Sequence, residues 1–313
     1  KGEHHGVFDT LVQQFVYELV SDPWFPHREE LQPGLGTDWA TLLGRYEPRC
    51  PEPKCDANVM PAEGIYAAAG GQPGYAKPPT LGRATHVGIN RARGVAEDAL
   101  LFTQETVQPE DGVSFWARVV AAPGYADVLE AALTGEHVLG RGRSRGMGAV
   151  AVATWPAPDG PSVAERLELF DAAVKRELAR YAEADGRVAS DGEGVYFALT
   201  QRSDALLTRG GLPASRPEPE ELGFPAGVMR VRSWARTATV GGWHSAAQLP
   251  YRTRQAVERG AVYLFYAPGG VDQKTLRDRL NTLEQIGIGE ERERGYGQVT
   301  ACAPFHYRLI VQA

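Results

Sequence analysis

A glycine-rich segment occurs twice in this chain, and the repeat limits the possible folds more than any other feature. The first copy spans residues 139–150 (LGRGRSRGMGAV) and the second spans residues 286–299 (IGIGEERERGYGQV). Both begin with an apolar residue and G-x-G and end with R-G-x-G-x-V, and the charged run between differs by two residues. Arg145 and Arg294 hold equivalent places 149 positions apart, about one domain length. Two copies of one fold are therefore the simplest interpretation.

The segments around the two loops repeat as well. A strand-like run and then a helix-like run precede each loop, and a β-rich apolar run follows it. These runs are 113–120, 125–133 and 149–155 in the first half, and 261–266, 274–284 and 299–303 in the second. In the second helix-like run, Leu276, Leu280 and Leu283 form one apolar stripe. Each half is therefore expected to end as strand, helix, glycine-rich loop and strand.

The second half contains two earlier strand-like runs, 194–200 and 228–236, and a Pro- and Glu-rich connection separates them. The order strand, connection, strand, strand, helix, strand is typical of the ferredoxin-like fold, which RNA-recognition modules also use. A helix over 162–184 is expected to join the halves, and the first half lacks a clear first strand. The sequence predicts an α+β chain with two ferredoxin-like (RRM-like, βαββαβ) domains in tandem. They are residues 1–160, incomplete at the N-terminus and carrying a cysteine-containing insertion, and residues 161–313.

Composition excludes several classes of protein. The net charge is −6, so nucleic-acid binding needs a local basic patch and does not follow from bulk charge. Three cysteines exclude a disulfide scaffold. No apolar run approaches the roughly 18 residues of a membrane span, and no signal peptide is visible, which favours a cytoplasmic protein without a membrane partner. Since the chain starts at Lys1 without a Met, the natural start is expected to be missing.

Glycine-rich turns bring backbone N–H groups close to a ligand, and consecutive amides form concave anion sites. Arginines beside them hold phosphates through paired hydrogen bonds. The first loop has three arginines and no acid, so we expect it to be the better phosphate binder. The second has three glutamates and two arginines, and is expected to act through its backbone or to pack against a neighbour. Ordinary solvated turns are the alternative. Walker and dinucleotide motifs are excluded, because G-K-[ST] is missing and each loop follows a helix and precedes a strand.

Several segments together resemble the RAMP superfamily of CRISPR–Cas RNA-guided complexes. They are the two loops, residues 5–11 (HGVFDTL), the C-x4-C pair at 50–55, residues 86–94 (HVGINRARG) and residues 242–250 (GWHSAAQLP). The resemblance is most specific to the large double-domain subunit of type III-D complexes, a relative of the subunit that caps the 5′ end of the guide RNA. It implies a non-catalytic scaffold that binds the crRNA guide. The implied partners are the large signature subunit, backbone RAMP subunits and target RNA.

The resemblance also implies which residues contact the guide. Residues 90–94 are interpreted as a short basic turn after a strand, for which an ordinary hairpin turn is the alternative. An exposed Trp243 is suited to stack on a splayed base, whereas a core or subunit contact is the alternative. Together with the loop glycines, Trp243 and His244, which are candidates from their own chemistry, the full set is Asn90, Arg91, Arg93, Gly140, Arg141, Gly142, Arg143, Arg145, Gly146, Trp243, His244, Gly289, Arg292, Arg294 and Gly295.

A structural zinc site is a further expectation. Cys50 and Cys55 have a spacing within the range of zinc ligands, but one pair is only half of a tetrahedral site. The resemblance places His5 near this pair as a third ligand, with His4 as an alternative. The fourth ligand stays open, either His27 or a residue before Lys1, and two unligated loop cysteines are the alternative interpretation.

No constellation marks a catalytic site. The alternative function is a RAMP endoribonuclease, which would process guide RNA with His137 or His244 as general acid or base. A backbone subunit that cleaves target RNA with a metal ion is a third possibility, and Asp98 and Asp111 are its candidates. Cys302 lies in the apolar last strand and is expected in the core.

Overall fold

The structure is a computed structural model. The residues that it describes are 7–35, 46–50, 55, 59–60, 65–69, 72–76, 80–108, 114–115, 117, 119, 122, 124–140, 142–143, 146–156, 160–190, 192–244 and 247–308. The chain forms two compact units, of which the first combines Lys1–Ala62 with Gly160–Ala313 and the second is Glu63–Asp159. The expected division into domains 1–160 and 161–313 stays a prediction.

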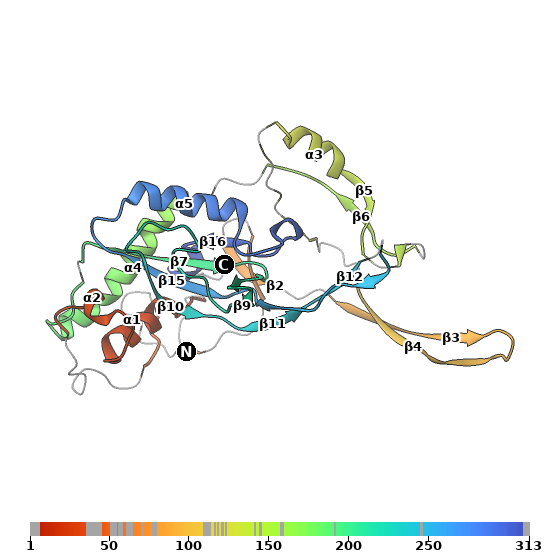
Figure 1. The fold of residues 1–313 in the computed structure, drawn as a ribbon, viewed down its shortest axis with the longest axis horizontal. Helices are drawn as coiled ribbons and strands as arrows, with labels where there is room; N and C mark the ends of the chain where they lie inside the picture. Colours follow the sequence, from red (N-terminus) through yellow and green to blue (C-terminus); the bar gives the residue numbers. More distant parts are fainter. Residues whose placement is uncertain are drawn as a thin grey trace. The chain divides into compact units, whose positions relative to one another are not determined.

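The first unit is built on a four-stranded antiparallel sheet with the order β10-β15-β7-β16 (Figure 1). Its strands are β7 (Val195–Gln201), β10 (Met229–Trp234), β15 (Val262–Ala267) and β16 (Val299–Ala301). Every residue of β15 is buried. All four strands expected from the apolar runs of the second half therefore form, and they belong to one sheet.

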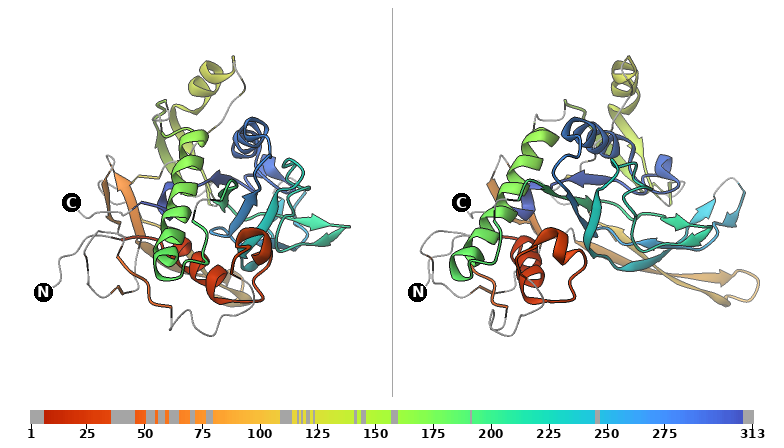
Figure 2. Two further views of the ribbon diagram at one scale, coloured as in Figure 1. Left: turned by 90° about the vertical axis from the view of Figure 1, so that its left-hand side faces the viewer. Right: turned by 60° about the vertical axis from the view of Figure 1, so that its left-hand side comes forward.

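Helices cover this sheet on both sides (Figures 1 and 2). Helix α5 (Gln273–Ile286) connects β15 to β16 and buries the expected stripe of three leucines. On the other side lies α1 (Leu11–Ser21), whose Phe15 ring meets the Tyr196 ring of β7 with centroids 5.7 Å apart. Helix α4 (Val163–Ala184) begins with a capping box in which Ser162 and Glu165 satisfy each other's backbone N–H groups. A one-turn helix, α2 (Arg28–Leu31), follows α1.

Two charged side chains close the open edge of β16. Arg166 of α4 and Glu284 of α5 form a bidentate ion pair with both N···O distances at 2.7 Å. Glu284 accepts the backbone N–H of Ala301 at 2.7 Å, and Arg166 donates to the Ala301 carbonyl at 2.6 Å. The edge strand therefore finds its missing hydrogen bonds in side chains. Because β16 directly follows the second glycine-rich loop, this contact also fixes the end of that loop.

The connection between β7 and β10 is irregular, as its Pro and Glu content predicts. It contains the short hairpin of β8 (Thr208–Arg209) and β9 (Leu212–Pro213), and all its residues are described, so no helix lies between these two sheet strands. Beyond β10 the chain forms two further ribbons. They pair β11 (Thr237–Val240) with β14 (Arg254–Val257), and β12 (Trp243–His244) with β13 (Leu249–Pro250).

The second unit consists of three hairpins and one helix among its described residues. Its elements are β1 (Ile65–Ala69), β2 (Gln72–Ala76), β3 (Leu81–Asn90), β4 (Val95–Val107), α3 (Ala126–Leu133), β5 (Gly135–Val138) and β6 (Ala149–Val152). The helix and the last strand of the repeated pattern are present, whereas the expected strand 113–120 is described only in part. No four-stranded sheet occurs in the part of this unit that the structure describes. The chain is therefore α+β, with one four-stranded sheet in its described residues.

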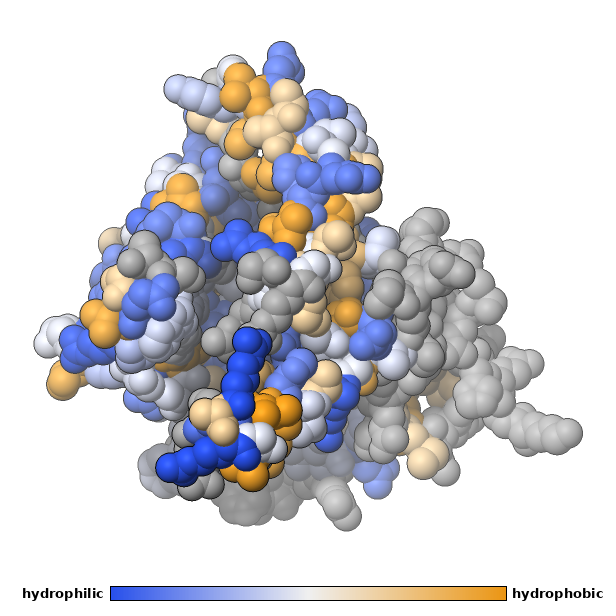
Figure 3. Space-filling model, turned by 90° about the vertical axis from the view of Figure 1, so that its right-hand side faces the viewer, coloured by the Kyte–Doolittle hydropathy of each residue, from blue (hydrophilic) through white to orange (hydrophobic). Residues whose placement is uncertain are grey.

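The β3–β4 hairpin exposes both apolar and basic side chains. On the face drawn in Figure 3, strongly hydrophilic residues lie beside hydrophobic ones. The exposed large apolar residues of this hairpin are Leu81, Val87, Ile89, Val95, Leu101, Phe102 and Val107. Among the described helices, none combines the length and the apolar character needed to cross a membrane.

Candidate nucleic-acid interface

The described residues of the two glycine-rich loops share a closing hydrogen bond and glycines with positive φ. In the first, the Leu139 N–H donates to the Gly148 carbonyl at 2.8 Å, and in the second, the Ile288 N–H donates to the Gly297 carbonyl at 2.8 Å. Each loop is thus closed by one hydrogen bond between residues nine apart, and each leads directly into a strand. The repeat seen in the sequence is therefore also a repeat in structure.

This geometry corrects the alignment of the two copies. The sequence comparison matched the first G-x-G of each loop and placed a two-residue difference in the charged run. The closing hydrogen bonds instead relate the loops by a constant offset of 149 residues, without an insertion. At this offset Gly140 (φ +87°) corresponds to Gly289 (φ +77°), and Gly142 (φ +78°) corresponds to Glu291 (φ +51°).

The last glycine of each loop is required by a close backbone approach. A Cβ on Gly148 would lie 1.9 Å from the Leu139 carbonyl oxygen, and a Cβ on Gly297 would lie 1.8 Å from that of Ile288. Both glycines also have positive φ, +84° and +72°. Only glycine fits such a position without moving the backbone.

Backbone N–H groups of the second loop are largely used within the chain. The N–H groups of Glu290 and Gly297 donate to the Leu206 and Asp204 carbonyls at 2.9 and 2.8 Å. At the 3-10 turn η2 (Arg292–Arg294), the N–H groups of Arg294 and Gly295 donate to the Glu291 and Arg292 carbonyls, both at 2.9 Å. An anion at this loop would therefore meet side chains more than free amides.

The arginines expected to contact RNA differ in their surroundings. Arg143 and Arg292 are exposed, while Arg141 and Arg145 lie outside the described residues. Arg294 forms an ion pair with Glu291, and its guanidinium carbon lies 4.1 Å from the centroid of the Tyr251 ring. The glycines of the expected set, Gly140, Gly142, Gly146, Gly289 and Gly295, all have positive φ and shape the loops.

A cavity of about 540 Å³ opens beside the second loop. The loop forms one wall, the β11–β14 ribbon and the residues before β14 form another, and the β8–β9 hairpin forms a third. Its lining includes Thr208, Tyr251, Arg252, Arg254, Glu290 and Arg294. Cationic, aromatic and hydroxyl side chains in one open cavity suit a phosphate with an attached unsaturated ring.

Two glutamates of the loop hold the cations of this cavity. Glu290 forms an ion pair with Arg254 and accepts the Thr208 hydroxyl at 2.6 Å, and Glu291 accepts from Arg254 at 3.0 Å. The Thr208 hydroxyl first, and then Arg254, lower the pKa of Glu290 below its ordinary value. The same glutamates raise the pKa of Arg254. Glu290 and Arg254 are therefore both charged at neutral pH.

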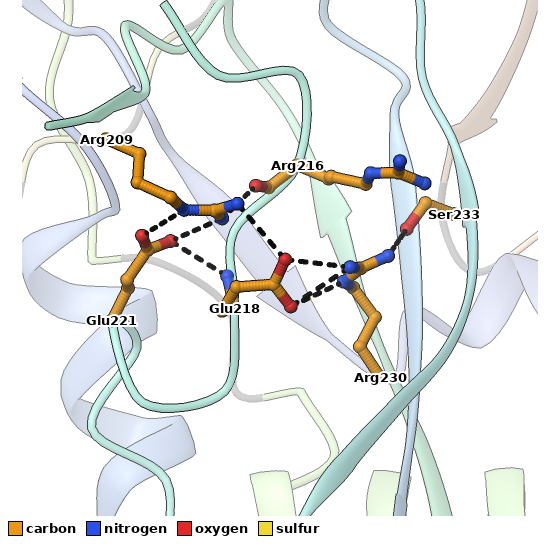
Figure 4. A network of polar contacts seen from close by, with 6 residues as sticks. All are labelled: Arg209, Arg216, Glu218, Glu221, Arg230 and Ser233. Atoms are coloured by element: carbon orange, nitrogen blue, oxygen red, sulfur yellow. Dashed lines mark hydrogen bonds and ion pairs between the residues drawn. The ribbon is translucent and has the colours of Figure 1, made fainter. Parts of the chain in front are cut away.

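A neighbouring ion-pair network fixes the hairpin wall of the cavity (Figure 4). Arg209, next to Thr208, donates to Glu221 at 2.6 Å and to the backbone carbonyl of Arg216 at 3.1 Å. Glu218 bridges Arg209 at 3.2 Å and Arg230 of β10 at 2.9 Å. The irregular connection is thereby tied to the sheet, which keeps Thr208 in place beside Glu290.

The basic turn expected over residues 90–94 is the tip of the β3–β4 hairpin. The Asn90 side chain accepts the N–H groups of Ala92 and Arg93 at 3.1 and 3.2 Å, so Asn90 shapes the turn. Arg91 and Arg93 are exposed at the tip. They are available to a polyanion, while the side-chain oxygen of Asn90 already accepts two backbone hydrogen bonds.

Trp243 and His244 form the short strand β12. Trp243 is 52% exposed, which leaves its ring accessible. His244 accepts the Ala247 N–H through Nδ1 at 3.0 Å, and its ring contacts Tyr251 edge to face at 5.3 Å. His244 is thus connected through Tyr251 to the wall of the cavity. Sequence reasoning missed Tyr251, Arg254 and Thr208, because only the fold brings them to the loop.

The zinc hypothesis is only partly covered by the structure. Cys50 and Cys55 are half-buried and not joined in a disulfide, and His5 lies outside the described residues, as does His4. No group of three or more His, Cys, Asp or Glu suited to hold a metal occurs among the described residues. Cys302 is fully buried, as expected for a core residue.

The candidates for catalysis are scattered. His137 lies in β5, where its Nε2 is 2.7 Å from the Leu133 carbonyl oxygen. Asp98 belongs to β4, and Asp111 lies outside the described residues. The described residues therefore do not bring a second catalytic group to either histidine candidate.

Comparison with known proteins identifies the family. No curated protein matches the chain. The model of one protein family, described as CRISPR-associated protein (Cas_Cmr3), matches residues 67–303, which include both glycine-rich loops and the cavity. The expected resemblance to a RAMP-type subunit of type III complexes is thereby confirmed. Because the match spans more than half of the chain, the protein belongs to the Cas_Cmr3 family and is a RAMP-type subunit of a type III (Cmr) CRISPR system.

Proposed function

We propose that this protein is a non-catalytic subunit that holds the crRNA guide, at its 5′ handle, through the two glycine-rich loops. The observation that carries the proposal is the repeated loop: the described residues of both copies share a closing hydrogen bond and glycines with positive φ, and Arg143 and Arg292 are exposed. Exposed Arg91, Arg93 and Arg143 add sites for phosphates. The acidic net charge agrees with a subunit whose RNA groove alone is basic.

The proposal includes the finer structural expectations. The sheet order β10-β15-β7-β16 supports a ferredoxin-like arrangement of the first unit, although its first helix is replaced by the irregular connection. We further propose the large signature subunit, backbone RAMP subunits and target RNA as partners, and structural zinc at Cys50, Cys55 and His5. Family membership supports the protein partners.

The test of RNA binding is a triple substitution in the first loop. The variant R141A/R143A/R145A is expected to bind guide RNA more weakly than the natural protein. The slope of log K against log salt should become shallower by roughly one unit for each phosphate that the variant no longer neutralises. The control variant R176A/R216A/R259A removes the same charge elsewhere. Equal affinity and slope in the two variants would contradict the proposal.

The alternative endoribonuclease function has its own test. Pure protein is incubated with repeat RNA, and the products are separated on a denaturing gel. We expect no specific cleavage. Cleavage that the His137→Ala or His244→Ala substitution abolishes would favour guide processing instead.

A further inference from the structure

The second glycine-rich loop has glutamates at two positions where the first loop has an arginine and a glycine. Glu290 and Glu291 correspond to Arg141 and Gly142 at the constant offset of 149 residues. Glu291 has the left-handed backbone conformation (φ +51°, ψ +37°), in which a side chain with a Cβ is strained and glycine is not. A strained residue at a surface site indicates a function that the fold alone does not require.

The side chains of these glutamates lie on the cations of the cavity. Arg254 pairs with both Glu290 and Glu291, and Arg294 pairs with Glu291 while it stacks on Tyr251. A guanidinium binds a carboxylate and a phosphate with the same paired geometry. The two glutamates therefore occupy the positions that phosphate oxygens would take on Arg254 and Arg294.

The glutamates can leave without unfolding the loop. The Glu290 side chain is 46% exposed and that of Glu291 is 29% exposed, so a rotated carboxylate reaches water. The loop backbone is held independently, through the Leu206 and Asp204 carbonyls and the closing hydrogen bond of Ile288. Exchange of a carboxylate for a phosphate thus requires only side-chain rotation.

We propose that Glu290 and Glu291 are an internal competitor for RNA: they block Arg254 and Arg294 in the free protein, and a guide phosphate displaces them. This inference rests on the proposed function, in which the loops bind guide RNA. A ligand that binds only through its negative charge finds Arg254 and Arg294 already paired with glutamates, and the three glutamates of the loop repel it. A strand that also stacks a base on an exposed aromatic ring compensates for the displacement. The competitor therefore favours the guide over other polyanions.

The experiment measures binding of a fluorescein-labelled single-stranded RNA by fluorescence anisotropy, between 50 and 300 mM salt. The variant E290Q/E291Q is expected to bind roughly ten-fold more tightly at the low-salt end, with a slope steeper by roughly one to two units, because two arginines become free for phosphates. The control E168Q/E183Q makes the same charge change on α4 and is expected to have little effect. Adding R254A/R294A to E290Q/E291Q should remove the gain. Inorganic polyphosphate should compete better against E290Q/E291Q than against the natural protein.

The outcomes separate this inference from the proposed function. If the natural protein binds RNA and E290Q/E291Q binds it no more tightly than the control variant does, the inference is overturned and the proposed function is not. If the natural protein does not bind RNA but E290Q/E291Q does, the result supports the internal competitor. The same result counts against RNA binding by the isolated natural subunit. Absence of binding in both would overturn both proposals. A thermal melt of each variant shows that its loop unit is folded.

Discussion

Substitution of Gly297 by alanine tests the loop geometry most directly. The new Cβ would lie 1.8 Å from the Ile288 carbonyl oxygen, a backbone atom that a side-chain rotation cannot move away. The φ of +72° adds about 1–2 kcal/mol for a residue with a Cβ. Backbone displacement would also break the hydrogen bonds of Gly297 with Ile288 and Asp204, each worth about 1 kcal/mol. We therefore expect Gly297→Ala to lower the free energy of unfolding by about 3–4 kcal/mol.

Gly295→Ala is the matched control. Gly295 also has positive φ (+88°), but no atom lies within 4 Å of its added Cβ. Only the conformational cost of about 1–2 kcal/mol then applies. Urea unfolding followed by circular dichroism measures both variants, and m-values must agree for the comparison to hold. Equal costs for the two substitutions would show that the close approach to Ile288 does not determine loop stability.

Three further predictions concern stability and thiols. Arg166→Met leaves Glu284 buried without its partner and should cost about 3–5 kcal/mol in urea unfolding, whereas R166M/E284L should recover part of that loss. Burial raises the pKa of the Cys302 thiol to about 12 from an ordinary value of 9.0, so its contribution to stability is complete below pH 9 and falls as the pH rises toward 12. That fall is about 1.4 kcal/mol per pH unit and should disappear from the pH–stability curve of Cys302→Ala. C50S/C55S should lose the zinc that metal analysis finds in the natural protein, and natural protein without zinc, purified without chelator, would contradict the metal site.

Local sequence patterns predicted the strands of the four-stranded sheet well, because the buried residues of each strand recur at regular positions. The apolar runs around β7, β10 and β15 predicted strands, and the leucine stripe of α5 predicted a helix. The four-stranded order could not be predicted in detail, because it depends on pairing between distant segments. The first half was harder, since its described hairpins expose many apolar residues and therefore lack a clear buried face.

The glycines in the sequence identified both loops, but they did not give the correct alignment of one loop with the other. Glycine identity suggested that G-x-G starts each copy, whereas the fold gives the role of Gly142 to Glu291. No pattern in a single sequence shows that a glutamate has positive φ. The cavity was missed for a related reason: Arg254 meets Glu291 across 37 residues, and no local spacing joins them.

The shared closing hydrogen bond and the unequal charges of the two loops predict that they contribute differently to the proposed RNA binding. Gly148→Ala should distort the first loop as Gly297→Ala distorts the second, because its Cβ would lie 1.9 Å from the Leu139 carbonyl oxygen. In the first loop, distortion displaces arginines that face no acid of the same loop, so affinity should fall. In the second, distortion also separates Glu291 from Arg254, which releases a cation and offsets the loss. Gly148→Ala should therefore weaken RNA binding more than Gly297→Ala at similar cost in stability, and the opposite ranking of affinities would refute the assignment of the first loop as the main phosphate binder.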